Sequence, residues 1–250
     1  MLTTERIGAT LVVTMRHAPV NAFGAEFVEA WNDLLDKRAG DDVAVMLVRS
    51  DQKVFSAGAD LKMMRAFFAG EDGAEKLVTH VEGMQRVFDR IEAAPFVSIA
   101  EIAGAALGGG FELALACDLR IAAQGATLGL PEARIGLIPG AGGTQRLTRL
   151  CGAGVARRVI LACDMMDGAT AGRLGLVQWS VPDAELPAFA LATAQRVAGL
   201  SAGALAASKR CIGAAQTAFG AGMTLERLET LRLLQTPDTR ARVRAFLEKK

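Results

Sequence analysis

Two glutamates, Glu112 and Glu132, are the residues of this chain whose surroundings best suit catalysis. Both are set among apolar residues and glycines: Glu112 follows the glycine run 108–110, and Glu132 follows a leucine and a proline. An ionised carboxylate is costly to bury unless it is hydrogen-bonded or takes part in chemistry. We therefore expect an active centre within residues 104–143.

The glycine run itself offers a second kind of chemistry. Glycines at the start of a helix leave backbone N–H groups free at the positive end of the helix dipole, which suits a developing oxyanion. The residues alone leave a structural alternative open, in which the glycines only permit tight packing and Glu112 only caps its helix. Small residues recur at 55–60, where a backbone can approach a ligand with its N–H groups free, although an ordinary strand-to-helix loop fits equally well.

The elements that must position these groups follow from apolar periodicity, and they predict an α/β body. A continuous apolar, β-branched run at 43–48 is typical of a buried parallel strand. The bulky apolar segment 61–73 favours core packing over a mobile flap. We expect strands within 2–16 (two, joined at Gly8), 43–48, 95–102, 119–123, 126–130 and 176–181, and helices over 25–37, 76–93, about 110–117, 144–150 and 154–163.

The character of the chain changes near residue 183, after which only helical patterns occur. We expect helices to about residue 199, over 202–219, around 225–234, and from Thr236, a good N-cap followed by proline. The sequence therefore predicts an α/β core over residues 1–183 and a C-terminal helical region over 184–250. So small a helical region is expected to pack on the body or on a neighbouring subunit, so we assign it a role in subunit contact.

Composition excludes several classes of protein. The chain has 250 residues, of which 51% are hydrophobic and 22% charged, with a net charge of +1. Such a chain is a soluble globular protein without the basic excess that binds nucleic acid. The start lacks the pattern of a signal peptide and no window is apolar enough to span a membrane, so we expect a cytoplasmic protein. The four dispersed cysteines predict reduced core thiols and no metal site, and His17 and His80 are expected to be ordinary turn and helix residues.

Three common glycine motifs are absent. The run after Gly140 has Gln145 where a dinucleotide fingerprint needs a third glycine, and no phosphate-binding P-loop pattern occurs. The nucleophile elbow of serine hydrolases fails around Ser56, because position 54 is Val54. Nicotinamide-dependent, nucleotide-hydrolysing and serine-hydrolase functions therefore lose their main support.

Several longer motifs together resemble the crotonase, or enoyl-CoA hydratase/isomerase, family. They keep the family's order and spacing from the N-terminal signature to the end of the chain. They are APVNA at 18–22, FSAGADL at 55–61, GAALGGGFELALACD at 104–118, LPE at 130–132, GLIPGAGGTQR at 136–146 and AFLE at 245–248. The resemblance implies an α/β fold of the crotonase type, a spiral of β-β-α units with a C-terminal helical region, assembled as a homotrimer or a dimer of trimers.

The resemblance also implies roles for particular residues. Backbone N–H groups of Ala59 and Gly109 form the family's oxyanion hole, and Glu112 and Glu132 match its two catalytic carboxylates. The other implied positions contact the substrate or shape the water site, and are Ala57, Gly58, Asp60, Lys62 and Gly140. The turn at 17–20 departs from the family in lacking a lysine that some relatives carry there.

The function implied is reversible hydration of a trans-2-enoyl-CoA to a 3-hydroxyacyl-CoA. An acyl-CoA thioester is then the substrate, and no separate cofactor is needed. Two alternatives stay open: a Δ3,Δ2-enoyl-CoA isomerase, which can work with one carboxylate, and a non-catalytic acyl-CoA-binding or RNA-associated scaffold. Retention of both glutamates argues against a scaffold, and near-neutral charge argues against RNA.

Overall fold

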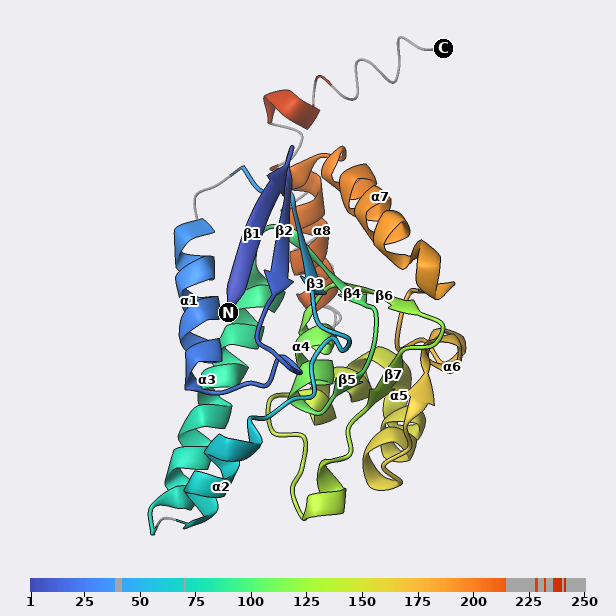
Figure 1. Cartoon of the computed structure of the whole chain (residues 1–250). Helices are drawn as coiled ribbons and strands as arrows, with labels where there is room; N and C mark the ends of the chain where they lie inside the picture. Colours follow the sequence, from blue (N-terminus) through green and yellow to red (C-terminus); the bar gives the residue numbers. More distant parts are fainter. Residues whose placement is uncertain are drawn as a thin grey trace.

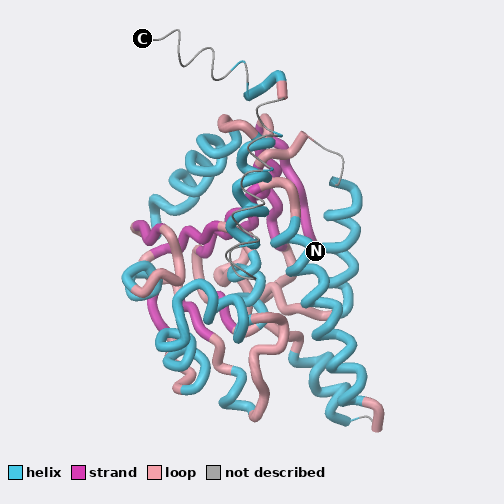
Figure 2. The backbone as a smooth tube through the Cα atoms, turned by 180° about the vertical axis from the view of Figure 1, so that it is seen from behind, coloured by secondary structure: helices cyan, strands magenta, loops and turns pink. Residues whose placement is uncertain are grey.

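The structure is a computed structural model that describes residues 1–38, 42–69, 71–214, 228, 232, 236–239 and 241. The helix expected around 225–234 and the motif at 245–248 lie largely or wholly outside these residues. Within them the chain forms two sheets enclosed by helices, as the tube in Figure 2 shows from behind. Among the helices of this part of the chain, none is long and apolar enough to cross a bilayer.

The larger sheet has six strands in the order β1-β2-β3-β4-β6-β9 (Figure 1). β1 pairs antiparallel with β2, and every later pairing is parallel, so the carboxyl ends of β2, β3, β4 and β6 share one edge. A parallel strand covered on both faces is buried along its whole length, as β4 is, including its two polar residues, Ser98 and Glu101. The strands are β1 Leu2–Ile7, β2 Thr10–Met15, β3 Val45–Ser50, β4 Val97–Ile102, β6 Leu119–Ala123 and β9 Trp179–Val181.

A smaller sheet of three short strands lies beside the helix that carries Glu112. Its order is β5-β7-β8, with β5 Ala106–Leu107, β7 Thr127–Gly129 and β8 Met166–Asp167. β5 leads directly into α4 Gly109–Ala116, which is buried along its whole length. The small sheet therefore fixes the point at which α4 begins.

Helices cover the strands and close the core. α7 packs on β3, β4 and β6, while α3 packs against α1, α2 and α4. Phe27, Trp31 and Phe88 form an aromatic cluster between α1 and α3. The helices are α1 Ala25–Arg38, α2 Leu61–Ala69, α3 Gly73–Ala93, α5 Gly143–Leu161, α6 Gly168–Arg173, α7 Leu186–Ala198 and α8 Ala202–Ala214, with short 3-10 helices at Glu132–Ile135 and Asp183–Glu185.

The sequence predicted the long elements and missed the short ones. The break expected between two helices near residues 150–154 appears as a non-helical Gly152, with φ 77°, inside α5. The last strand is shorter than expected, because residues 176–178 form the turn that precedes Trp179. Segment 61–73 was expected to pack in the core, but it contains the mostly exposed helix α2, in which Met64 is buried and Leu61 is 74% exposed. β5, β8 and α6 were not expected, because two-residue strands and a six-residue helix carry too little periodicity to be recognised.

Candidate active site

A cavity of about 470 Å³ brings together the residues expected to do chemistry. Its wall includes Ala59, Gly109, Glu112, Glu132 and Gly140, which come from separate segments of the chain. The rest of the wall consists mostly of apolar side chains. They are Met63, Met64, Leu77, Val78, Val81, Met84, Leu137, Ile138 and Ala141. The cavity therefore combines a polar end with an apolar lining, as ligand sites usually do.

Ala59 pairs with Phe23 in an isolated parallel β-bridge, which sets the direction of the Ala59 N–H. In that bridge the Phe23 N–H donates to Gly58 O at 2.8 Å, and the Asp60 N–H donates to Phe23 O at 3.2 Å. A parallel bridge uses the peptide groups on either side of Ala59, so the N–H of Ala59 itself points away from Phe23. Among the described residues no acceptor is found for it, which leaves this donor available to a ligand.

Gly109 supplies the second donor at the first residue of α4. Its N–H has no intrahelical partner, as expected for a helix start, and no other acceptor is found among the described residues. Gly58, with φ 87°, lies against this point: a Cβ added there would be 2.8 Å from Leu107 O and 3.1 Å from Gly109 N. Only glycine permits such a close approach, so Gly58 is what allows the segment of Ala59 to lie beside α4.

Glu112 lies in the first turn of α4, with only 2% of its surface exposed. Its Oε1 accepts a hydrogen bond of 2.8 Å from the N–H of Gly143, which begins α5. Glu112 is thus held by another segment and does not simply cap its own helix. Burial raises the pKa of Glu112 to about 7, opposed by the Gly143 N–H and reinforced by the negative charge of Glu132.

Glu132 begins the short 3-10 helix Glu132–Ile135 and lines the cavity. A Cβ added at Gly108 would be 3.0 Å from its Oε1, so the carboxyl group packs against the turn that leads into α4. Burial raises the pKa of Glu132, and its Oε2 is buried with no hydrogen-bond partner among the described residues. A buried oxygen without a partner is unusual and indicates a position kept for a ligand or for water.

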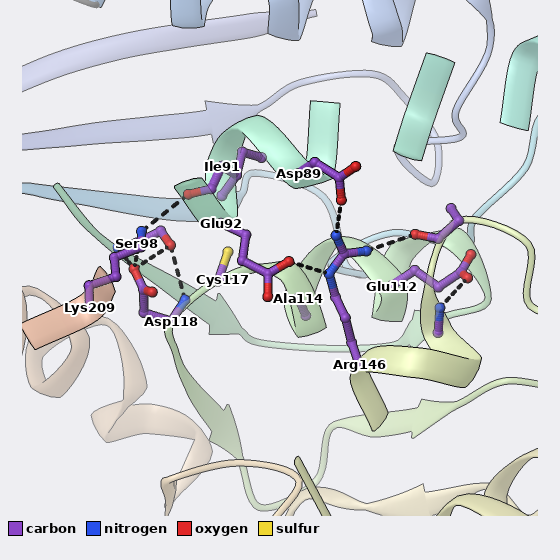
Figure 3. Close-up of polar contacts among 12 residues, drawn as sticks. Asp89, Ile91, Glu92, Ser98, Glu112, Ala114, Cys117, Asp118, Arg146 and Lys209 are labelled. Carbon is purple, nitrogen blue, oxygen red and sulfur yellow. Dashed lines mark hydrogen bonds and ion pairs between the residues drawn. The ribbon is translucent and has the colours of Figure 1, made fainter. Parts of the chain in front are cut away.

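Arg146 fixes the turn between Gly140 and the start of α5 (Figure 3). Its guanidinium donates to Ala141 O at 3.0 Å, and on α3 to Glu92 at 2.9 Å and Asp89 at 2.6 Å. This ties the turn, and with it the N–H of Gly143 that holds Glu112, to α3. The carbonyl of Gly140 accepts from Gln85 Nε2 at 2.6 Å, which anchors the same turn a second time.

The other residues expected to contact substrate lie next to the cavity but not in its wall. The Ala57 N–H donates to Val20 O at 3.0 Å, which pairs that segment with the chain before α1. Asp60 accepts from the N–H groups of Lys62 and Met63 at 2.7 and 2.9 Å, so it caps the start of α2. Lys62 is exposed at the outer surface of α2. Contacts of Ala57, Gly58, Asp60 and Lys62 with substrate stay predictions.

Two residues that sequence reasoning gave no function hold or line the site. Asn21 is 2% exposed, and its side chain donates to Phe55 O at 3.1 Å while its own carbonyl accepts from Ser56 Oγ at 2.8 Å. Asn21 therefore fixes the segment that carries Ala59. Its place in the motif at 18–22 is the feature of the sequence that could have indicated this role. His80 lies in the cavity wall, although a single histidine on an amphipathic helix gave no such signal.

Comparison with known proteins identifies the family. The model of the Enoyl-CoA hydratase/isomerase family matches residues 5–250. A probable enoyl-CoA hydratase of Bacillus subtilis (strain 168) is 36% identical over 242 residues, which cover 96% of this chain and 92% of the relative. A probable enoyl-CoA hydratase 2 of Arabidopsis thaliana, named as mitochondrial, is 37% identical over 233 residues, or 92% of this chain and 76% of the relative.

Solved structures are similar over the whole chain. DspI of Pseudomonas aeruginosa superposes with a TM-score of 0.91 at 39% identity, covering 100% of this chain and 94% of the other. An enoyl-CoA hydratase of Bacillus anthracis superposes with a TM-score of 0.93 at 31% identity, covering 100% and 96%. These similarities confirm the expected α/β fold with C-terminal helices. The chain belongs to the enoyl-CoA hydratase/isomerase, or crotonase, family.

Proposed function

We propose that this protein is an enoyl-CoA hydratase, which reversibly adds water to a trans-2-enoyl-CoA to give a 3-hydroxyacyl-CoA. The observation that carries this proposal is one cavity with two carboxyl groups, of buried Glu112 and half-buried Glu132, and two backbone donors, Ala59 and Gly109, that have no acceptor in the described part of the chain. The apolar remainder of the wall suits an acyl chain. The resemblance and the relatives named as probable hydratases support the same reaction.

The two N–H groups act on the thioester carbonyl. When water attacks C3 of the enoyl group, negative charge moves through the conjugated system onto the carbonyl oxygen. Donors aimed at that oxygen stabilise the resulting enolate by roughly 3 kcal/mol each, as in other oxyanion holes. Burial excludes water that would compete for these donors and strengthens their effect.

The two carboxyl groups handle the protons. Burial raises the pKa of both carboxyl groups, and the negative charge of Glu132 raises that of Glu112 further, which favours a pair that shares one proton. The ionised member takes a proton from water as the oxygen bonds to C3, and the protonated member delivers its proton to C2. The dehydration direction uses the same groups with their roles exchanged.

The test is the absorbance of the conjugated enoyl thioester in crotonyl-CoA and in a panel of longer enoyl-CoA substrates. Hydration removes the conjugation, so absorbance falls, and the panel identifies the preferred chain length. No loss of absorbance at any chain length would contradict the proposal. A gain of absorbance from a 3-enoyl-CoA, without hydration of the 2-enoyl isomer, would assign the isomerase reaction instead.

Assembly and compartment are part of the same proposal. We propose a homotrimer or dimer of trimers, in which the region after residue 183 takes part in subunit contact. Both α7 and α8 pack on the sheet of their own chain, and Ile212 of α8, which is 68% exposed, is a candidate for the subunit contact. Light scattering during size-exclusion chromatography measures the mass of the assembly. A cytoplasmic location stays a prediction.

A further inference from the structure

His80 lies between the active cavity and a second one. It belongs to α3 and, like Met63, contributes to the wall of both the 470 Å³ cavity and a neighbouring cavity of about 520 Å³. The first cavity is also lined by Ala59 and the second by Ala25. His80 therefore lies between the segment of Ala59 and the beginning of α1, which is where Phe23 is found.

The ring of His80 has an unfilled hydrogen-bonding requirement. Nε2 is buried and makes no hydrogen bond of normal geometry with any described residue. Burial lowers the pKa of His80, opposed by the adjacent backbone of Phe23, so the imidazole is neutral and carries one N–H donor. Buried polar atoms without partners are rare in folded proteins, and each calls for an explanation.

Phe23 touches both halves of the oxyanion hole. Its N–H and carbonyl make the bridge around Ala59, and its ring lies so close to α4 that a Cβ at Gly109 would be 3.3 Å from Cδ2. Phe23 is completely buried, so a shift of its backbone moves the segment of Ala59 with it. Its carbonyl oxygen accepts one hydrogen bond, from Asp60, and retains a second lone pair.

We propose that His80 is a positioning residue for the oxyanion hole, whose ring N–H donates to Phe23 O when acyl-CoA fills the cavity and so fixes the direction of the Ala59 N–H. Hydrogen bonds of this kind are often long or poorly aligned in empty sites and tighten in the substrate complex. His80 acts through Phe23 and does not itself touch the reacting atoms. This inference rests on the proposed binding of an enoyl thioester by Ala59 and Gly109.

The experiment compares three substitutions at His80 with a neighbouring control. His80→Phe keeps a ring but removes the donor, His80→Met does so with a flexible side chain in case the first variant does not fold, and His80→Gln restores an N–H. Thr79→Val is the control, because Thr79 is exposed on the same helix and lines only the second cavity. The readouts are kcat and KM for crotonyl-CoA, thermal unfolding, and the absorbance of a bound cinnamoyl-CoA thioester.

The bound thioester reports on the oxyanion hole directly, because its absorbance moves to longer wavelength when the carbonyl oxygen is strongly hydrogen-bonded. We expect His80→Phe and His80→Met to lower kcat about tenfold, with KM changed less than about twofold. The same variants should show a smaller absorbance shift of the bound thioester. His80→Gln should recover most of kcat and most of the absorbance shift. Thr79→Val should match the unsubstituted protein.

Three outcomes would overturn the inference. One is a full absorbance shift in His80→Phe or His80→Met, even with reduced thermal stability, since His80 would then only support the fold. Another is a large rise in KM at unchanged kcat, which would make His80 a contact of the acyl group. The third is a His80→Gln variant as impaired as His80→Phe. If the unsubstituted protein shifted the absorbance of the bound thioester but hydrated no enoyl-CoA, the proposed hydratase function would be refuted. The absorbance shift of the His80 variants would still test the role of His80.

Discussion

The two ends of helix α4 differ in how far their polar groups are hydrogen-bonded: the N-terminal end is unsatisfied and the C-terminal end is satisfied. At the N-terminal end, the N–H of Gly109 and Oε2 of Glu132 have no partner among the described residues, and Glu112 accepts a hydrogen bond from Gly143. At the C-terminal end, the buried guanidinium of Arg120 donates to backbone carbonyls. The acceptors are Ala114 O at 3.2 Å, Cys117 O at 2.6 Å and Leu176 O at 2.9 Å.

A second cluster of hydrogen-bonded side chains, centred on Asp118, lies next to the C-terminal end of α4 and is seen on the left of Figure 3. Asp118 Oδ2 accepts from Ser98 N, Ser98 Oγ and Lys209 Nζ at 2.7, 2.9 and 2.8 Å. Lys209 donates further to the carbonyls of Ile91 and Phe96, so α8 is fastened to the body at this point. One end of α4 is therefore saturated with internal hydrogen bonds, and the other keeps donors and acceptors that a substrate can use.

The largest expected effect is on turnover, and it comes from removing a carboxylate at the N-terminal end of α4. Folding should be affected much less. We expect Glu112→Gln and Glu132→Gln each to lower kcat for crotonyl-CoA hydration about a thousandfold, because each removes a group that transfers a proton. Binding of the saturated butyryl-CoA, measured by calorimetry, should weaken less than about threefold, because the oxyanion donors remain.

A matched control for these variants is Glu101→Gln. Glu101 is also a buried carboxylate, 5% exposed and with an unpartnered Oε2, but it belongs to β4 and is not in the cavity wall. Its replacement should leave kcat within about twofold. Near-normal turnover in Glu112→Gln or Glu132→Gln would refute the role given to that glutamate.

Breaking the satisfied end should instead cost stability. Arg120→Met removes the donor to the carbonyls of Cys117 and Leu176, leaves Ala114 O with only the 3.3 Å bond from the Cys117 N–H, and takes a positive charge from the negative end of α4. We expect the free energy of unfolding, from urea titration, to fall by about 3 kcal/mol or more. Below the unfolding transition, kcat per folded molecule should stay within a few-fold of normal.

Arg158→Met is the corresponding surface control. The side chain of Arg158 is 52% exposed and pairs with Asp164, so its loss should change the free energy of unfolding by less than about 1 kcal/mol. The contrast between the two ends of α4 would be wrong if Arg120→Met were as harmless as Arg158→Met. It would also be wrong if Arg120→Met abolished turnover in fully folded protein.

The sequence predicted the unsatisfied end much better than the satisfied one. Glu112 and Glu132 are conspicuous because carboxylates are rare in apolar, glycine-rich surroundings, and the motifs that resemble the family include Ala59 and Gly109. Arg120 lies two residues after Asp118, within a strand expected over 119–123, and nothing in its neighbours marks it out. Only the fold shows that the guanidinium turns back to cap α4.

The other elements that could not be predicted from the sequence share one physical cause. Pairing between short segments that are far apart in the chain leaves no local pattern of residues. The bridge of Phe23 to Ala59 and the strands β5 and β8 consist of one or two residues each, too few for a period to appear. Long elements such as α3 and β4 were predictable because many residues share one buried face. The scaffold could therefore be predicted element by element. The pairing of Ala59 with Gly109 as an oxyanion hole is a prediction from the resemblance, and how their segments are brought together is visible only in the structure.

The last and smallest expected effect concerns how stability depends on pH. Burial raises the pKa of both Glu112 and Glu101 to about 7, the latter opposed by Arg49. An acid with a raised pKa in the folded state binds its proton more tightly there than in the unfolded chain. The protein therefore loses stability as pH rises from the ordinary glutamate pKa to about 7, and the full cost is present above that.

Glutamine carries no charge at any of these pH values, so Glu112→Gln and Glu101→Gln should each remove one such cost. We expect each variant to match the original protein near pH 4.5 and to exceed it by about 1–2 kcal/mol near pH 8, as measured by urea unfolding across that range. Only Glu112→Gln should lose turnover, because Glu101 does not face the cavity. If the stability gain at Glu112 failed to grow with pH, its carboxylate would be ionised without cost, and the N-terminal end of α4 would be as well satisfied as the C-terminal end.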